Sequence, residues 1–294
     1  MYKQIASNKR RSMLLMFVFV VLVGGLGWIF SMYLGEPALT PFILLGAGIY
    51  ALISYISGSR MALAINGAKE IQRRDNPRLW RTVENLAITE GMPMPKVYIM
   101  QDPAPNAFAT GRDPKHAAVC ATTGLLEIMD DSELQGVMAH ELGHIKNYDI
   151  RLTMIAFALV VVISLLADVM IRMAWFGGGR SRGNNNGNAI FLVVGILAAI
   201  LTPIIAKMIQ LAISRKREYL ADATGALTTR YPEGLARALE KIGQYGSATK
   251  TQHTASAHLF FANPLKGNKL AGMFTTHPPI EERVKRLRNM GANA

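Results

Sequence analysis

The stretch VMAHELGHIKNYDI, residues 137–150, contains two histidines four positions apart, with a glutamate next to the first. On a helix such residues share one face, so the imidazoles of His140 and His144 can reach one cation. Glu141 lies beside them, where its carboxylate can take a proton from metal-bound water. The alternative is an ordinary amphipathic helix that matches this spacing by chance. The stretch therefore predicts a zinc site, with the ordinary helix as the competing interpretation.

The sequence before this stretch indicates a soluble segment that contains helices and strands. RLWRTVENLAITEG has apolar residues at helical spacing and ends at Gly91. Three strands are predicted over PKVYIM, NAFAT and HAAVCATTGLL. The helix that carries the histidines then begins near Asp130, which with Glu133, or Ser132 instead, supplies the N-terminal cap. Strands followed by a capped HELGH helix are the context that a zinc protease domain requires.

A hydrolytic zinc needs a third protein ligand, and a second segment offers one. SRKREYLADATGA, residues 214–226, contains Glu218 and Asp222, again four positions apart. One carboxylate can bind the metal while the other accepts the second N–H of a ligating histidine. The alternative is an acidic pair that balances the basic residues 215–217 on a solvated face.

Long apolar runs flank both ligand segments. Half of the 294 residues are hydrophobic, and they are concentrated in runs rather than spread along the chain. A run of about 20 apolar residues is long enough to cross a bilayer as a helix. The sequence therefore predicts a multi-pass membrane protein with spans at about 13–34, 38–57, 151–173 and 189–213.

These runs divide the chain into four parts. Residues 1–59 are predicted to form a first membrane hairpin, and 60–150 the first part of the domain with the HELGH helix. Residues 151–213 would form a second hairpin, and 214–294 the second part of that domain. Two predicted spans lie between the two ligand segments, and two crossings bring the chain back to the side from which it started. Both ligand segments therefore lie on the same side of the membrane.

The basic residues indicate which side this is. The net charge is +12, and many basic residues flank apolar runs, which favours cytoplasmic membrane flanks over a nucleic-acid surface. Both sides of the first hairpin are basic and its turn is not, which places the N-terminus and residues 60 onward in the cytoplasm. Arg180 and Arg182 conflict with placing the loop 177–188 outside the cell, because basic loops are typical of the cytoplasmic side. A hairpin that enters the membrane without crossing it would also leave both ligand segments on the same side.

Several classes of function lack support. No zinc finger, RNA-binding aromatic motif or basic zipper points to nucleic acid, and no phosphate-binding loop points to ATP. Cys120 is the only cysteine, so no intrachain disulfide can form. We expect it to be a small buried hydrophobe rather than a nucleophile.

The motifs NAFATG, AHELGH, REYLADATGA and THPPIEERVKRL, in this order and around paired apolar runs, resemble the HtpX family of membrane-bound zinc metalloproteases. These are relatives of the CAAX prenyl-protein proteases, and the resemblance covers essentially the whole chain. It implies an α+β fold: a mainly α-helical integral membrane protein with a gluzincin-like domain of helices and a small sheet, interrupted by a membrane hairpin.

The resemblance also implies roles for individual residues. One zinc ion per chain would be bound by His140, His144 and Glu218, and Glu141 would activate water. Asp222 and Arg283 would support the ligands, and His277 would stabilise the oxyanion. The predicted edge strand would hold an extended substrate by backbone pairing through Asn106, Ala107, Phe108 and Ala109.

The expected function is an endopeptidase of the cytoplasmic (inner) membrane that faces the cytosol and cleaves misfolded or damaged membrane proteins. The resemblance places it in protein quality control and stress response, beside other membrane quality-control proteases. The rivals are a CAAX-type prenyl-protein protease and a non-catalytic zinc-binding scaffold. Residues 246–272 are a candidate lid, and self-cleavage is expected to be possible because flexible cytosolic segments lie near the site.

Overall fold

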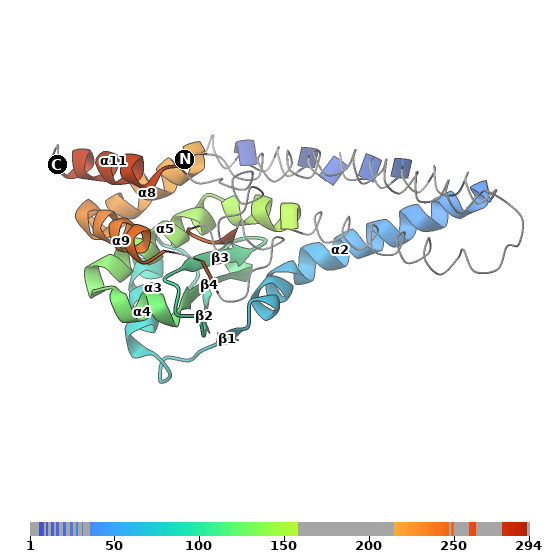
Figure 1. Ribbon diagram of the computed structural model, residues 1–294. Helices are drawn as coiled ribbons and strands as arrows, with labels where there is room; N and C mark the ends of the chain where they lie inside the picture. Colours follow the sequence, from blue (N-terminus) through green and yellow to red (C-terminus); the bar gives the residue numbers. More distant parts are fainter. Residues whose placement is uncertain are drawn as a thin grey trace, which may run out of the picture.

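The computed structural model describes residues 36–157, 215–246, 248–249, 259–262 and 278–292, with scattered positions between 6 and 31. Figure 1 shows a globular part from which the long helix α2 extends as an arm. The elements in chain order are η1 (Pro37–Leu39), α2 (Thr40–Ile65), β1 (Ala68–Glu70), α3 (Pro77–Thr89), β2 (Lys96–Met100), β3 (Ala107–Gly111), η2 (Pro114–His116), β4 (Ala117–Thr122), α4 (Thr123–Ile128), α5 (Asp131–Lys146), α8 (Arg215–Thr229), α9 (Pro232–Tyr245) and α11 (Ile280–Ala292).

The sheet is mixed, with strand order β1-β2-β4-β3. β2 pairs with β4 in parallel, and the two outer pairs are antiparallel. Phe108 on β3 lies opposite Cys120 on β4, and Cys120 is buried as expected. Burial raises the pKa of its thiol, so it is not an activated nucleophile. The predicted strands are confirmed in β2, β3 and β4, whereas β1 was not predicted.

One predicted strand was too long. The sequence predicted a strand through residue 126, but β4 ends at Thr122 and α4 begins at the next residue. The side chain of Thr122 accepts a hydrogen bond from the backbone N–H of Leu125. This threonine is therefore a helix cap, and the β-branched sequence around it hid the change of structure.

α5 is the central helix of the globular part (Figure 1). α3, α8, α9 and the strands β3 and β4 pack around it, and 11 of its 16 residues are buried. Its start confirms the predicted capping box. Asp130 Oδ1 accepts from the N–H of Glu133 at 2.9 Å, and Glu133 Oε2 accepts from the N–H of Asp130 at 2.8 Å. The cap fixes where the helix begins, and hence where its histidines lie.

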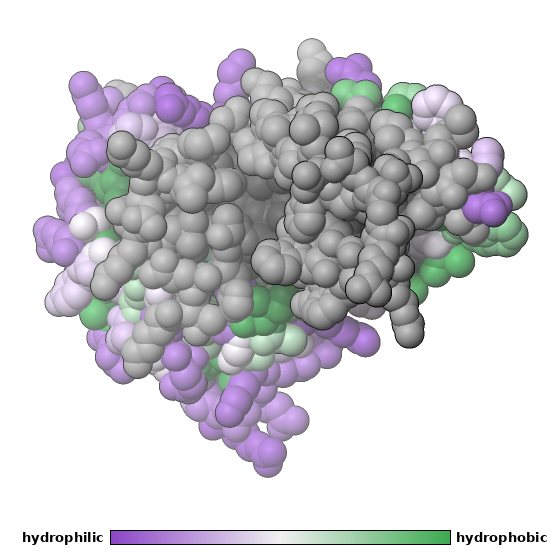
Figure 2. All heavy atoms as spheres, turned by 45° about the vertical axis from the view of Figure 1, so that its right-hand side comes forward, coloured by the Kyte–Doolittle hydropathy of each residue, from purple (hydrophilic) through white to green (hydrophobic). Residues whose placement is uncertain are grey.

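The arm formed by α2 covers the predicted span 38–57 from Thr40 onward and continues to Ile65, while residues 38 and 39 belong to η1. Its large apolar side chains are exposed, among them Phe42, Leu45 and Leu52. In Figure 2 hydrophobic residues appear at the right-hand end of the molecule, and hydrophilic residues over the lower and left-hand surface. Such an exposed apolar surface is typical of a membrane-facing helix.

Within the part of the chain that the structure describes, no single helix passes a length and hydropathy test for crossing a membrane. The two parts of α2, Thr40–Tyr50 and Tyr55–Ile65, pass it together, with a bend of 60° between them. The predicted spans at 151–173, beyond residue 157, and at 189–213 lie outside the described residues. The span at 13–34 is described only at scattered positions, and the loop 177–188 not at all.

Candidate metal centre

The two histidines of α5 and a glutamate of α8 converge on one point. His140 Nε2 lies 3.1 Å from His144 Nε2, and Glu218 brings one carboxylate oxygen within 3.4 Å of His144 Nε2. Its other oxygen lies 3.8 Å from His140 Nε2. All three residues can offer one ligand atom within 4.8 Å of the others. Two imidazoles and a carboxylate form a donor set that suits a divalent transition metal.

Small residues allow α5 and α8 to approach this closely. A Cβ atom added to Gly225 on α8 would lie 3.1 Å from the backbone nitrogen of His140. A Cβ added to Gly143 on α5 would lie 3.5 Å from the Cα of Ala221. The glycines of both motifs therefore set the distance at which Glu218 reaches the histidines.

The other nitrogen of each imidazole faces a carboxylate. His140 Nδ1 lies 2.9 Å from Asp222 Oδ1, and His144 Nδ1 lies 3.0 Å from Asp149 Oδ2. In the neutral rings each Nδ1 therefore carries the proton and donates it. The unprotonated Nε2 atoms then face each other, an arrangement that a cation stabilises.

The charge of the surroundings also suits a cation. Four carboxylates are buried here with two guanidinium groups, which leaves an excess of negative charge: Glu141, Asp149, Glu218 and Asp222 against Arg217 and Arg283. Buried charges require compensation, because the interior solvates them poorly. A divalent ion would supply it.

The two histidines bind protons differently. Burial lowers the pKa of His140 to about 4, although the hydrogen bond with Asp222 opposes this shift. Burial also lowers the pKa of His144, but the hydrogen bond with Asp149 and the charges of Glu218 and Glu141 outweigh it and raise the pKa to about 9. A metal ion at this point therefore competes mainly with a proton on His144.

Arg283 of α11 completes the surroundings of His140. It is buried and donates from Nε and Nη2 to the two oxygens of Asp222, at 2.9 and 2.7 Å. Burial raises the pKa of Asp222, but Arg283 and His140 outweigh this and lower it to about 2. Asp222 therefore stays ionised between the arginine and the histidine.

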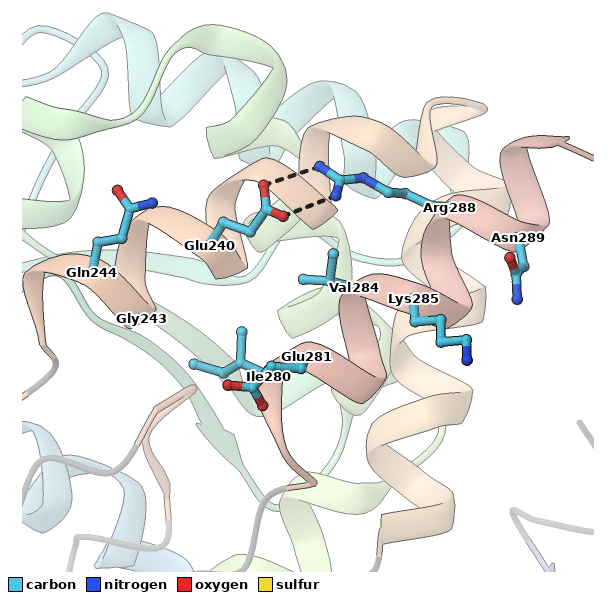
Figure 3. Close-up of a pocket in the computed structure, with 9 residues that line it drawn as sticks. All are labelled: Glu240, Gly243, Gln244, Ile280, Glu281, Val284, Lys285, Arg288 and Asn289. Carbon is cyan, nitrogen blue, oxygen red and sulfur yellow. Dashed lines mark hydrogen bonds and ion pairs between the residues drawn. The ribbon is translucent and has the colours of Figure 1, made fainter.

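The position of α11 depends on its packing against α9 (Figure 3). Ile280 and Val284 face α9 across a surface cavity, and Arg288 pairs with Glu240 at its far end. Arg283, one residue before Val284, is buried and reaches Asp222 of α8. The exposed pair of Arg288 and Glu240 thus helps to hold the helix that carries Arg283.

Asp149 is a site residue that the sequence analysis missed. It lies within the quoted stretch, five residues after His144, but α5 has already ended at Lys146. Its other oxygen, Oδ1, lies 3.5 Å from Nε of Arg217 on α8. The helical spacing used to find the other residues could not identify it, since it is placed by a turn.

The predicted substrate strand is covered by a segment of the same chain. Phe260 forms an antiparallel bridge with Phe108, and the N–H of Phe261 donates to the carbonyl of Ala107 at 2.7 Å. The side-chain amide of Asn106 binds the backbone of Ala262, donating to its carbonyl at 2.8 Å and accepting from its N–H at 3.1 Å. Residues 259–262 therefore lie along the edge of β3.

This segment also contacts the metal centre. The ring of Phe261 meets His140 edge to face, with 4.9 Å between ring centroids, and the Arg283 guanidinium lies 4.8 Å from the Phe261 centroid. The covered edge of β3 and the metal centre are thus neighbours. A peptide paired with β3 would pass beside the metal ligands.

Most predicted site residues come together, and the solvated alternatives are wrong. Glu218 and Asp222 are only 4% and 3% exposed, so they do not form a surface pair with the basic run. His140 and Glu141 are buried as well, unlike polar residues on an ordinary amphipathic helix. His277 lies outside the described residues, just before the segment that begins at residue 278.

Comparisons with known proteins found similar sequences and a similar fold. A model of Peptidase family M48 matches residues 73–291. The "Protease HtpX homolog" of Tropheryma whipplei (strain Twist) is 52% identical over 291 residues, 99% of each chain. That of Lactobacillus helveticus (strain DPC 4571) is 47% identical over 301 residues, 99% of this chain and all of the other. The crystal structure of S. mikatae Ste24p is similar in fold, with TM-score 0.50 and 18% identity over 98% of this chain and 67% of that one.

Proposed function

This chain belongs to peptidase family M48 and is a membrane metalloprotease, and we propose that it uses one zinc ion to cleave misfolded or damaged membrane proteins. The observation that carries the zinc assignment is the convergence of His140, His144 and Glu218. Zinc–ligand bonds of about 2.0–2.1 Å in a tetrahedron place ligand atoms roughly 3.3 Å apart. The two Nε2 atoms lie 3.1 Å apart, which agrees with that spacing. Each has a different oxygen of Glu218 near it, Oε1 at 3.4 Å from His144 and Oε2 at 3.8 Å from His140.

The bound ion would polarise the peptide carbonyl and make a water molecule more acidic. Glu141 follows His140 directly on α5, and its carboxylate is the proposed general base. It would accept the proton of the attacking water and then deliver it to the leaving amine. Asp222 and Asp149 would keep the two histidines in the tautomer that leaves both Nε2 atoms free to bind zinc.

His277 is proposed to donate a hydrogen bond to the oxyanion. Its own position lies outside the described residues, but α11 begins three residues later, at Ile280. Arg283, one turn further along α11, reaches Asp222 in the metal centre. The start of α11 is therefore anchored beside the proposed zinc ligands, which supports this role.

Substrate is proposed to bind as an extended strand along β3. Asn106 would bind its backbone as it now binds that of Ala262, and residues 107–109 would pair with it. Because residues 259–262 already occupy this edge, we propose that they leave it when substrate binds. Residues 259–262 fall within the candidate lid 246–272, most of which lies outside the described residues.

The active site is proposed to face the cytosol, with four membrane spans and the second hairpin at 151–213. The basic flanks of the apolar runs support this orientation. Leu227 is 79% exposed on α8, and a cysteine at that position would react with an impermeant maleimide. Labelling in inverted membrane vesicles but not in intact cells would support the orientation, and the reverse pattern would overturn it. Buried Cys120 should stay unlabelled in both.

The proposed function is tested with full-length protein in detergent. Metal content is measured by mass spectrometry, and cleavage of an unfolded polypeptide is followed before chelation, after chelation and after zinc is restored. We expect one zinc per chain, loss of cleavage on chelation and recovery with zinc. Zinc binding without any cleavage would favour the scaffold, and cleavage confined to a prenylated CAAX peptide would favour the prenyl-protein protease.

A further inference from the structure

Asn8 precedes the first apolar run in the sequence, yet its side chain is buried beside the metal centre. Its Nδ2 donates to Asp149 Oδ1 at 2.7 Å and to the carbonyl of Asn147 at 3.0 Å. Asn8 is 1% exposed, although Ala6 nearby is exposed. One amide group from the N-terminal segment therefore joins two residues of the turn that follows α5.

The conformation of this turn has to be stabilised by other contacts, because the hydrogen bonds of α5 no longer fix the backbone there. α5 ends at Lys146, Asn147 is its C-terminal cap, and Tyr148 has a positive φ of 60°. A non-glycine residue in the left-handed region is held there by its surroundings, at some cost in free energy. Asn8 bonds to the residue before Tyr148 and to the residue after it, and so holds both sides of the strained position.

The bond to Asp149 has a further consequence for its carboxylate. One oxygen, Oδ1, accepts from Asn8 and lies near Arg217, while the other, Oδ2, faces His144 Nδ1 at 3.0 Å. Fixing Oδ1 fixes the rotation of the group, and hence the direction of Oδ2. Within the described residues the Oδ1 of Asn8 has no hydrogen-bond partner, an unfavourable state for a buried amide.

We propose that Asn8 is a positioning residue, which holds Asp149 in the orientation that makes His144 a metal ligand. The N-terminal segment is thereby connected to the metal centre, because Asn8 bonds to Asp149 and Asp149 bonds to His144. This inference rests on the proposed function only in taking His144 to be a zinc ligand. A residue that merely anchors the N-terminal segment would affect stability and leave zinc affinity unchanged.

The test measures zinc affinity of the full-length protein in detergent, by competition with a chromophoric chelator. The variants are Asn8→Ala, Asp149→Ala and the double variant, with Asn8→Ser in place of Asn8→Ala if that variant does not purify. Asn66→Ala is the matched control, because Asn66 is also buried and donates to a backbone carbonyl, that of Ala62 at 2.7 Å. The absorption spectrum of the cobalt-loaded protein gives a second readout of ligand geometry.

We expect Asn8→Ala to weaken zinc binding about tenfold and to alter the cobalt spectrum, since the neighbours of metal ligands contribute factors of roughly 10–100. In the Asp149→Ala background the same change should have almost no further effect, because Asn8 acts through Asp149. Unchanged zinc affinity in Asn8→Ala, equal losses in Asn66→Ala, or additive losses in the double variant would overturn the inference. If the parent protein bound no zinc, the proposed function itself would fail.

Discussion

Arg283 and Asp222 form a buried ion pair with two parallel hydrogen bonds, of 2.9 and 2.7 Å, between helices α11 and α8. The same carboxylate lies 2.9 Å from Nδ1 of His140. Asp222 therefore transmits the position of α11 to a candidate metal ligand. The pair joins the last segment of the chain to its metal centre.

Replacing Arg283 with methionine should destabilise the protein by about 3–5 kcal/mol, because Asp222 would remain as a buried charge without its partner. Arg286→Met on the same helix is the control. Arg286 pairs with Glu282 at 2.8 Å and lies over the ring of Tyr219, but it is half exposed, so its loss should destabilise the protein far less. Thermal unfolding in detergent measures both, and equal shifts in the two variants would contradict the structural role of Arg283.

Asp149→Asn should reduce zinc affinity about 10–100-fold, because a neutral amide holds the His144 tautomer less firmly than a carboxylate. Asp113→Asn is a matched control, since Asp113 bonds to Nδ1 of His116 at 2.8 Å in the same way but at the surface. Chelator competition measures the affinity of both. If the two variants bound zinc equally well, Asp149 would have no role in the site.

Gly225→Ala should weaken the contact between α5 and α8, because its Cβ would press on the backbone of His140. Crowding of this kind costs about 1–3 kcal/mol, and it should also lower zinc affinity by moving Glu218 away from the histidines. Gly291→Ala on α11 has open space around its Cβ and should be neutral or slightly stabilising. An unchanged melting temperature and zinc affinity in Gly225→Ala would contradict this prediction. It would mean that α5 and α8 can move apart without losing stability or metal binding.

A disulfide between positions 108 and 260 should switch off the protease reversibly. The two phenylalanines are direct antiparallel partners, and such pairs have Cα separations of about 4.5–5.5 Å, within the range for a disulfide. Cys120 lies opposite Phe108 on β4 and is replaced by alanine to prevent mispairing. After oxidation we expect less than about a tenth of the activity that the same variant has in its reduced form, because the locked segment excludes substrate from β3. Reduction of the disulfide should restore the activity.

The two variants with a single introduced cysteine, at position 108 or at position 260, control for the loss of each aromatic ring. Mass spectrometry under oxidising conditions establishes that the bond has formed. Full activity of the cross-linked protein would mean that residues 259–262 are a permanent strand, and that substrate binds elsewhere.

The sequence predicted those parts of the site that follow local rules. The capping box at Asp130 located the start of α5, and the helical repeat placed His140 beside His144 and Glu218 beside Asp222. These relationships depend on residues three or four apart, which a single helix determines. The motifs then indicated that the two helices share a metal, and the structure brings their side chains together.

The remaining features depend on pairs of residues that are distant in the sequence or joined by turns. Asp149 reaches His144 only because the chain turns through Tyr148, and Asn8 reaches Asp149 across 141 residues. The pairing of residues 259–262 with β3 involves four residues and a backbone pattern that carries no periodic signal. Such contacts are decided by tertiary packing, which overrides local preference.

The central claim is that Glu141 is the base of a zinc protease. Its most direct test compares parent protein and Glu141→Gln, both loaded with zinc, in the cleavage of an unfolded polypeptide. The account predicts equal zinc content and a loss of cleavage of at least about a thousandfold, since glutamine keeps the shape of the side chain but cannot accept the proton. Equal cleavage by the two proteins, with zinc bound in both, would contradict it.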